Sequence, residues 1–328
     1  MYLHYRYKKG EKMCQILFPV GLVISEQHLS FDEMKAYEVG WDMQSLQVQS
    51  GPFYSKIQGV HTPNMQLGIH TYSKGMMFRG TYPKGCILLY GFTSEVLPTS
   101  HNDIVVENEI LVGFPGHEVD IIINSPCVAY TLVVEEKSFN KAFYNYFSTS
   151  FTEYMSAHKL LVEYSRGEAL LELFKTQLEA LSKLESDAMT AEDYEKLETA
   201  YLNILFSYLQ NQEKEVQRMK FDISKVRRYF DENIGDYISI TDVSKALNIS
   251  ERQLYNAFKK TYGITPKKYL LTRRFNAIYQ ELKYATAIDT TISDIVAKYG
   301  FTHMSHFTKE FKRLFHKIPS ELLAQEVV

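Results

Sequence analysis

The chain has 328 residues, of which 45% are apolar and 23% charged, and its formal net charge is −3. This length can hold two domains with ordinary cores, and the composition excludes a disordered chain. No apolar run approaches the roughly 20 residues that span a bilayer, and the first ten residues lack the apolar stretch of a signal peptide, so we expect no membrane partner.

The charge is divided unevenly along the chain. From Arg218 to Val328 there are 19 Lys and Arg against 12 Asp and Glu, a net charge of +7. Residues 1–217 hold the other 17 Lys and Arg against 27 Asp and Glu, a net charge of −10. A basic region joined to an acidic region is typical of a polyanion-binding module attached to one that does not touch the polyanion, although many structural domains are equally basic.

The three cysteines, Cys14, Cys86 and Cys127, are scattered and odd in number. They predict reduced thiols in a reducing compartment, and neither a disulfide framework nor a zinc site. We therefore expect a cytoplasmic protein.

From about Cys14 to Phe139 the sequence is typical of short antiparallel strands. Pro, Gly, Asn and Ser separate runs of β-branched and aromatic residues at short intervals. These runs are Gln47–Gln49, Gln66–Tyr72, Cys86–Tyr90, Asp120–Ile123 and Ala129–Val134. The spacing predicts an antiparallel sandwich or barrel. Such strands suit a filled core as well as the lining of a ligand cavity, so no effector-binding residue follows from them.

Near Lys137 the apolar period changes to that of helices, and it stays so to about Gln217. One helix is expected over Gly167–Leu184 and another from Thr190, where Thr-Ala-Glu-Asp forms a capping box. One face of the second helix is apolar and consists of Leu197, Tyr201, Ile204, Leu205, Tyr208 and Leu209. That stripe is either a dimer interface or the side that packs on the sheet.

From Lys220 onward the sequence is helical throughout, and the charge change places a domain boundary at Arg218–Asp222. Helix breaks are expected at Gly235, Gly263, Pro266, Gly300 and Pro319. Within this helical region the segments Ser239–Pro266 and Thr291–Pro319 repeat one another. Each has a short helix, a tight turn and a second helix, which is the plan of a helix-turn-helix unit.

The repeats agree in their structural positions. Each first helix begins with a capping box, Ser239 to Asp242 in one copy and Thr291 to Asp294 in the other. Each turn has a residue suited to the left-handed conformation, Asn248 or Gly300. Both repeats end in a proline that suits the first position of another helix. Apolar anchors of the second helices are Leu254, Phe258 and Tyr262, and Phe307, Phe311 and Phe315.

The remaining positions of each second helix are rich in hydrogen-bond donors. In the first copy they are Arg252, Gln253, Tyr255, Asn256, Lys259 and Lys260. In the second copy they are His303, Met304, Ser305, His306, Lys309, Lys312 and Arg313. Residues near a recognition-helix start can meet base edges, and lysines further along suit phosphates. Any solvated helix has such residues, but two matching copies in a basic domain favour binding to double-stranded DNA through the major groove.

Residues 220–325 resemble the DNA-binding domain of the AraC/XylS family of transcriptional regulators. The resemblance rests on Ile295-Val-Ala, Tyr299-Gly-Phe, Ser305, Phe307, Phe311-Lys-Arg and Pro319-Ser in the second copy. The sequence departs from the family at His316, where glycine is usual, and this asks for a costlier turn.

The resemblance implies seven helices, two recognition helices in successive major grooves, and a rigid linker helix over Leu270–Tyr284. It favours base contacts from Arg252, Tyr255 and Asn256 in the first unit. In the second unit it favours His303, Met304, Ser305, His306 and Lys309. Arg273 and Arg274 on the linker are either phosphate contacts or members of salt bridges within the linker.

The resemblance also implies an N-terminal, cupin-like β-barrel that binds an effector, followed by helices for dimerisation. The expected fold class is therefore α+β, with an antiparallel barrel over 1–139, a helical dimerisation region over 140–217 and an all-α DNA-binding domain over 218–328. The helix-turn-helix units are 239–262 and 291–315. On this plan the apolar stripe from Leu197 to Tyr208 becomes the dimer interface of a homodimer.

Signals of catalysis are few. A metal-binding cupin needs a His-x-His pair, and His70-Thr-Tyr offers a single imidazole, so neither a metal nor a cofactor is expected. A DNA-targeted enzyme would need a zinc site or an activated cysteine, and the separated cysteines argue against it. We expect a bacterial transcription regulator that is not an enzyme, associates with the nucleoid when bound, and responds to a small molecule. The alternative is a regulator whose barrel serves only as a dimer scaffold.

Overall fold

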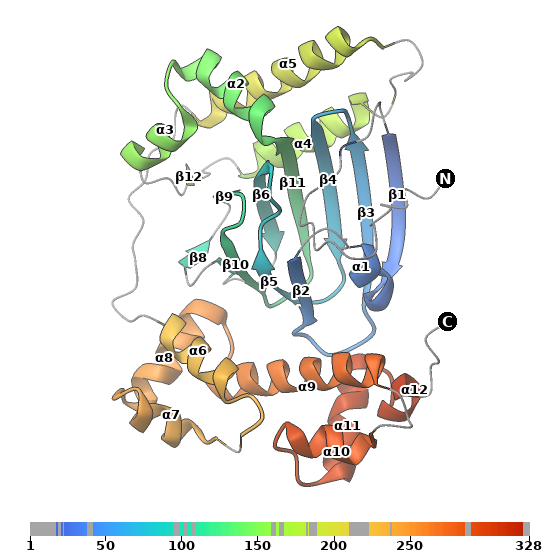
Figure 1. Cartoon of the computed structure of the whole chain (residues 1–328), viewed down its shortest axis with the longest axis vertical. Helices are drawn as coiled ribbons and strands as arrows, with labels where there is room; N and C mark the ends of the chain where they lie inside the picture. Colours follow the sequence, from blue (N-terminus) through green and yellow to red (C-terminus); the bar gives the residue numbers. More distant parts are fainter. Residues whose placement is uncertain are drawn as a thin grey trace.

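The computed structural model of the chain describes residues 18, 21, 23–37, 42–94, 99–101, 104–106, 109–158, 162–163, 167–181, 183, 189–209, 223–236, 238–285 and 290–323. A strand-rich half occupies the upper region of Figure 1, and the C-terminal helices lie below it. None of the described helices is both long and apolar enough to cross a bilayer. The boundary predicted at Arg218–Asp222 lies outside the described residues.

The strands form two sheets in which the paired strands are antiparallel. The larger sheet has the order β1-β3-β4-β11-β6-β9-β12, and the smaller has the order β2-β5-β10-β7-β8. The strands are β1 Val23–Ser30, β2 Asp42–Gln47, β3 Tyr54–His61, β4 Met65–Tyr72, β5 Met76–Thr81, β6 Cys86–Ser94, β7 Thr99–His101, β8 Ile104–Val106, β9 Glu109–Gly113, β10 Glu118–Ile123, β11 Cys127–Glu135 and β12 Val162–Glu163. The described strands thus make two separate sheets and not a closed barrel, within the α+β class that we expected.

The central strand β11 shows how the sheets share their cores. It pairs with β4 on one side and with β6 on the other. Ala129 and Val133 belong to a core that includes Phe78 of the smaller sheet. Tyr130 and Leu132 belong to a second core, which contains helical residues. Because successive side chains of a strand point to opposite faces, β11 is buried on both.

Helices cover the outer face of the larger sheet. They are α2 Glu136–Phe147, α3 Phe151–His158, α4 Gly167–Leu181 and α5 Ala191–Leu209. Phe139, Phe143 and Phe206 of α2 and α5 are fully buried in the core that they share with this sheet. The change of period predicted near Lys137 is confirmed by the start of α2, and the capping box at Thr190 is present.

One short helix of this half, α1 Phe31–Tyr37, was not predicted from the sequence. It follows β1 directly, at the end of the strand that lies toward the C-terminal half (Figure 1). Two hydrogen bonds close its first turn. The Glu33 carboxylate accepts from the backbone N–H of Ser30 at 2.7 Å, and the Ser30 hydroxyl accepts from the backbone N–H of Glu33 at 3.5 Å. This reciprocal arrangement is a capping box.

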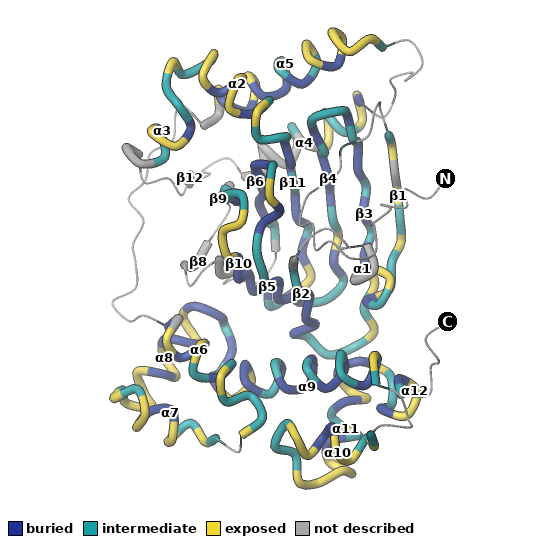
Figure 2. The backbone as a smooth tube through the Cα atoms, viewed as in Figure 1, coloured by how far each residue is buried: buried dark blue, intermediate teal, exposed yellow. Residues whose placement is uncertain are grey.

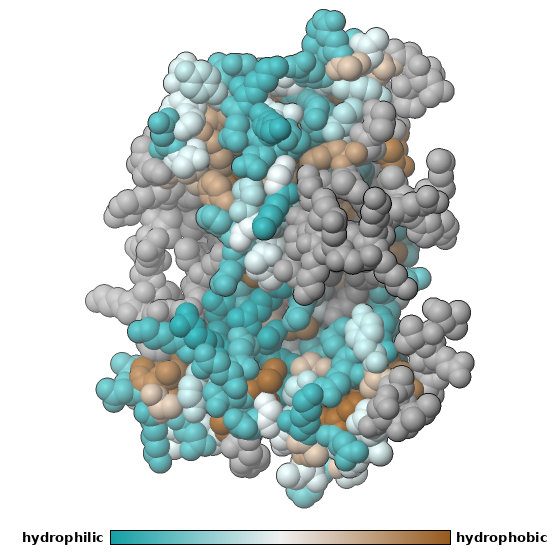
Figure 3. Space-filling model, viewed as in Figure 1, coloured by the Kyte–Doolittle hydropathy of each residue, from teal (hydrophilic) through white to brown (hydrophobic). Residues whose placement is uncertain are grey.

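The C-terminal half consists of seven described helices, as the family resemblance implied. They are α6 Ser224–Glu232, α7 Ile240–Ala246, α8 Glu251–Tyr262, α9 Pro266–Tyr284, α10 Ile292–Lys298, α11 Met304–Phe315 and α12 Pro319–Leu323. Helix α9 packs against β2 of the smaller sheet, with α10 and α11 on its other side, and is largely buried (Figure 2). Exposed residues are concentrated on α7, α8, α10 and α11, and the surface over these helices is mainly hydrophilic with separate apolar patches (Figure 3).

Two histidines on β3 and β4 make the stability of the fold depend on pH. Burial lowers the pKa of His61 and of His70 from 6.5 to about 4, and the charge of His61 adds to the effect on His70. The Nε2 atom of His70 lies 3.1 Å from the Thr131 hydroxyl. In the unfolded chain both imidazoles take up protons at a higher pH than in the folded chain.

We therefore expect the free energy of unfolding to fall as the pH drops from about 6.5 to about 4, by roughly 3 kcal/mol for each histidine. Urea denaturation at a series of pH values measures the slope. His70→Gln should flatten the slope in this range, because it removes one of the two groups. An unchanged slope in the variant would show that folding does not lower the pKa of His70.

Candidate nucleic-acid interface

The first helix-turn-helix unit is formed by α7 and α8. The Ser239 hydroxyl accepts from the backbone N–H of Asp242 at 3.2 Å, and the Asp242 carboxylate accepts from the backbone N–H of Ser239 at 2.9 Å. These bonds confirm the predicted capping box. Asn248 in the turn has φ 52°, the left-handed conformation expected of it.

Helix α8 divides into a buried face and an exposed face. Leu254, Phe258 and Tyr262 are fully buried, as predicted for the anchors. Their aromatic rings pack on Tyr269 of α9, with centroid distances of 5.4 Å from both Phe258 and Tyr262. The residues predicted to face DNA are all exposed, namely Arg252, Gln253, Tyr255, Asn256, Lys259 and Lys260.

The start of α8 has a second capping box, which was not predicted. Gln253 accepts hydrogen bonds through Oε1 from the backbone N–H and the hydroxyl of Ser250, at 3.0 and 2.9 Å. The Ser-x-x-Gln spacing in the sequence is the signal that predicts it. The amide oxygen of Gln253 is thus engaged at the helix start, and its NH2 group is the portion that remains to meet a base.

The second unit is formed by α10 and α11. Thr291 and Asp294 form the predicted capping box. Gly300 in the turn has φ 77°, and His316, which follows α11, has φ 54°. The backbone of His316 therefore adopts the left-handed conformation although this residue carries a side chain, which is the costlier turn expected from the sequence.

Helix α11 is anchored by aromatic rings. Phe307 and Phe311 are fully buried and Phe315 is 8% exposed. Phe307 stacks on Phe275 of α9 at 5.5 Å with an interplanar angle of 14°. The residues predicted to face DNA are exposed, namely His303, Met304, Ser305, His306, Lys309, Lys312 and Arg313. Of these, Arg313 donates to the Glu310 carboxylate through Nε and Nη2, so it is held along the helix.

The linker α9 belongs to the cores of both units. It begins at Pro266, earlier than the predicted start at Leu270, because Thr265 caps it and proline suits the first turn. Tyr269 packs in the first unit, and Phe275 and Tyr279 pack in the second. One continuous helix thus fixes the two recognition helices relative to each other.

The two linker arginines, predicted as phosphate contacts or as members of salt bridges, are both turned toward the protein. Arg273 forms a salt bridge at 3.0 Å with Asp231, which belongs to α6 and not to the linker itself. Arg274 is 6% exposed and donates to the backbone carbonyls of Ile234 and Asp236. Buried donors that already have acceptors are poorly placed to bind phosphate.

The apolar stripe on α5, predicted as a dimer interface, lies largely against the chain's own sheet. Tyr201 and Leu205 are 5% and 1% exposed and belong to the core under the larger sheet, and Leu197 is partly buried against it. Ile204 is 39% exposed and faces away from this core. Helical spacing cannot show which element covers an apolar face, and here the chain's own sheet covers most of it. The side chain of Tyr208 lies outside the described residues.

Two tandem helix-turn-helix units of this kind define a DNA-binding domain. Residues 243–325 match a protein family described as "Helix-turn-helix domain". The chain is 33% identical over 101 residues to the XylDLEGF operon transcriptional activator of Pseudomonas putida, which covers 31% of this chain and 32% of that protein. It is 33% identical over 100 residues to the lactose operon transcription activator of Staphylococcus xylosus, which covers 30% of this chain and 35% of that protein.

Among solved structures, similarity was found to a transcriptional regulator of Chromobacterium violaceum described as having an AraC-type DNA-binding domain. The identity is 29%, the match covers 31% of this chain and 89% of that chain, and the TM-score is 0.29. The chain thus matches about a third of the length of its curated relatives. Its C-terminal region is a helix-turn-helix domain of the AraC/XylS type, which confirms the resemblance over the matched residues.

Proposed function

We propose that the chain is a sequence-specific, DNA-binding transcription regulator. The observation that carries the proposal is the pair of recognition helices, α8 and α11, anchored through buried aromatic rings to one rigid helix while donor-rich faces stay exposed. A rigid pair of such helices suits two successive major-groove segments on one face of DNA. The curated relatives, which are transcription activators, support the same conclusion for this domain.

We assign roles by position along each recognition helix. Arg252, Tyr255 and Asn256 near the start of α8 are proposed to meet base edges, since Arg suits guanine and Asn suits adenine. On α11 the base-reading residues are proposed to be His303, Met304, Ser305, His306 and Lys309. Lysines later in the helices, Lys259 and Lys312, suit phosphates, which add affinity without sequence information.

Selection of the full chain against a random DNA library tests the proposal. We expect enrichment of a motif with two unlike sub-sites separated by about one helical turn, roughly 10 base pairs, because α8 and α11 expose different residues. Recovery of DNA without any shared motif would contradict sequence-specific binding.

The selected site then tests the individual roles. Arg252→Ala should relax the preference at one base position and weaken binding to the preferred base by about 1–3 kcal/mol. Lys312→Ala is the matched control: it should weaken all sequences alike and reduce the slope of log K against log salt by about 0.9. Fluorescence anisotropy on preferred and substituted sites measures both. Equal, uniform losses in the two variants would show that Arg252 does not read a base.

We further propose that the first half, 1–217, senses a small molecule and mediates a homodimer, with a sensing region over 1–139, a helical region over 140–217 and the DNA-binding domain over 218–328. The order of a two-sheet domain, helices and tandem units supports this plan. Thermal-shift screening of the full chain with metabolites and lipids tests sensing, and sedimentation analysis tests the dimer. A dimer that responds to no ligand would favour the scaffold alternative.

The competing proposal, a DNA-targeted enzyme with a cysteine nucleophile, is not favoured. Cys86 and Cys127 are both buried, and burial raises the pKa of each thiol to about 12. A protonated, inaccessible thiol is a poor nucleophile. Cys14 lies outside the described residues.

A further inference from the structure

The two halves of the chain meet over a mixed apolar and polar interface. Leu46, Met77 and Ile122 of the smaller sheet share a core with Phe258 and Tyr269 of the DNA-binding half. Around this core, charged groups join the halves at two separate places, one beside each helix-turn-helix unit. The side chains of Gln47 and Asn124 add hydrogen bonds to the carbonyls of Leu314 and Tyr262. The position of the DNA-binding half is therefore set by the N-terminal half.

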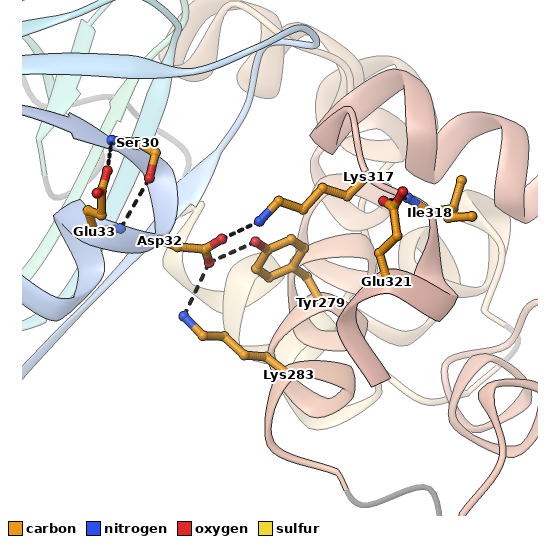
Figure 4. Close-up of polar contacts among 8 residues, drawn as sticks. All are labelled: Ser30, Asp32, Glu33, Tyr279, Lys283, Lys317, Ile318 and Glu321. Carbon is orange, nitrogen blue, oxygen red and sulfur yellow. Dashed lines mark hydrogen bonds and ion pairs between the residues drawn. The ribbon is translucent and has the colours of Figure 1, made fainter. Parts of the chain in front are cut away.

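Beside the second unit, the charged connection is the carboxylate of Asp32 on α1 (Figure 4), and Gln47 of β2 adds a buried hydrogen bond from its Nε2 atom to the carbonyl of Leu314 at 3.0 Å. Its Oδ1 atom accepts from the Tyr279 hydroxyl at 2.7 Å and lies 3.2 Å from Nζ of Lys283. Its Oδ2 atom lies 2.5 Å from Nζ of Lys317. Tyr279 and Lys283 lie one turn apart on α9, and Lys317 lies between α11 and α12. All three of these donors belong to the DNA-binding half.

The cluster is electrostatically unbalanced, with two ammonium groups for one carboxylate. Burial opposes ionisation of Asp32, but the hydrogen bonds from Lys317 and Tyr279 and the charges of Lys317 and Lys283 outweigh it and hold the pKa of Asp32 below its ordinary value. The carboxylate is therefore charged at neutral pH. Its removal would leave Lys283 and Lys317 as two unneutralised cations in the basic half of the chain.

Beside the first unit, the connection is a chain of alternating charges. Arg227 pairs with Asp120, Asp120 with Arg79, Arg79 with Asp231, and Asp231 with Arg273. The Asp120 side chain is only 6% exposed, whereas that of Asp32 is 26% exposed. Water and salt reach the Asp32 cluster more easily, and partly exposed ion pairs contribute little to stability. Of the two charged connections, the one at Asp32 is the easier to open.

We propose that Asp32 is a latch that holds the second helix-turn-helix unit against the N-terminal half and competes with DNA for Lys283 and Lys317. The proposal rests on the DNA-binding function proposed above. Lys317 is the second residue after α11, whose last turn carries Lys312 and Arg313, so it continues a basic segment. Phosphates compete with a carboxylate for such cations, and the charge of Asp32 opposes their approach. Opening the latch loosens the contact between α1 and the second unit and exposes both lysines, while the apolar core that Phe31 shares with Tyr279 remains.

Asp32→Asn in the full chain tests the latch, because asparagine keeps the shape and removes the charge. Hydrogen exchange should become at least about threefold faster in α1 and in the turn around Lys317, without a change in the core strands. The Kd for the selected DNA site should fall by about 3- to 10-fold, with a slope of log K against log salt steeper by about 1 to 2, one unit for each freed lysine. A higher Kd would show instead that the contact prepares the unit for DNA, and would overturn the proposal.

Glu33→Gln is the matched control for charge. Glu33 neighbours Asp32 on α1, but its carboxylate closes the helix at Ser30 and does not reach the DNA-binding half (Figure 4). Glutamine keeps an acceptor for that cap. The exchange rates and the Kd should stay within about twofold of the wild type. An effect equal to that of Asp32→Asn would show that loss of any negative charge on α1 is sufficient, and would contradict the latch.

A double-mutant cycle with Lys283→Gln and Lys317→Gln completes the test. In the background without both lysines, Asp32→Asn should no longer accelerate exchange in α1. Persistent acceleration would contradict the latch. The exchange measurements need no DNA, so they test the interdomain contact even if the chain fails to bind DNA, an outcome that would contradict the proposed function alone.

Discussion

Replacing Phe311 by alanine is expected to remove about 3–5 kcal/mol from the free energy of unfolding of the DNA-binding half. Phe311 is fully buried, and its ring lies 5.4 Å from that of Phe307, 4.8 Å from Phe315 and 6.1 Å from Tyr279. Alanine would leave a cavity among these rings, and close packing elsewhere prevents the helices from filling it. Because α11 is held to α9 by these contacts, the second recognition helix should lose its fixed position.

Guanidinium denaturation followed by circular dichroism measures the loss, and anisotropy on the selected DNA site measures its consequence. We expect binding to weaken to the level of non-sequence-specific DNA. Lys309→Ala on the exposed face of the same helix is the control for stability and should change the free energy of unfolding by no more than about 0.5 kcal/mol. A destabilisation below about 1 kcal/mol in Phe311→Ala would mean that α11 is not anchored by this core.

The helix-turn-helix units could be predicted because their signals are local. The capping boxes at Ser239 and Thr291 and the left-handed residues Asn248 and Gly300 each act within a few positions of the chain. The spacing of the aromatic anchors determined which face of each recognition helix is buried. The residues predicted to face DNA are the positions of each recognition helix that these anchors leave exposed.

The interface between the halves could not be predicted, because its partners are far apart in the sequence. Asp32 lies 247 positions from Tyr279 and 285 positions from Lys317. No periodic pattern links such residues, and only the packing of α9 against the smaller sheet brings them together. For the same reason Arg273 was left with two roles, because its partner Asp231 is 42 positions away.

The apolar face of α5 shows a different limit. The pattern at Tyr201 and Leu205 predicted a buried face correctly, but a dimer interface and an intramolecular core have the same periodicity. The strands that cover this face, such as β4 and β11, end more than fifty positions earlier in the chain. The family plan favoured the dimer interface, whereas in the structure the chain's own sheet packs against Tyr201 and Leu205.

Asp120→Asn should be the most damaging single change at the interface between the halves. Asp120 on β10 pairs with Arg227 of α6 and, at 3.3 Å, with Arg79 of β5. The side chains of Asp120 and Arg227 are only 6% and 12% exposed. Removal of one partner of a buried ion pair leaves the other charge unpaired in a poorly solvated place, which costs about 3–5 kcal/mol.

The loss should appear as a change in cooperativity, because Asp120 joins the two halves. In the wild type we expect calorimetry to show one unfolding transition for the full chain, and in Asp120→Asn the DNA-binding half should unfold separately and at a lower temperature. Glu118→Gln, at an exposed position on the same strand, is the matched control and should shift the free energy of unfolding by no more than about 0.5 kcal/mol. A single unshifted transition in Asp120→Asn would show that the apolar core around Met77 and Phe258 couples the halves without the ion pairs.

Comparison with Asp32→Asn then separates the two charged connections. The buried pair at Asp120 should govern stability, and the more exposed latch at Asp32 should govern DNA affinity.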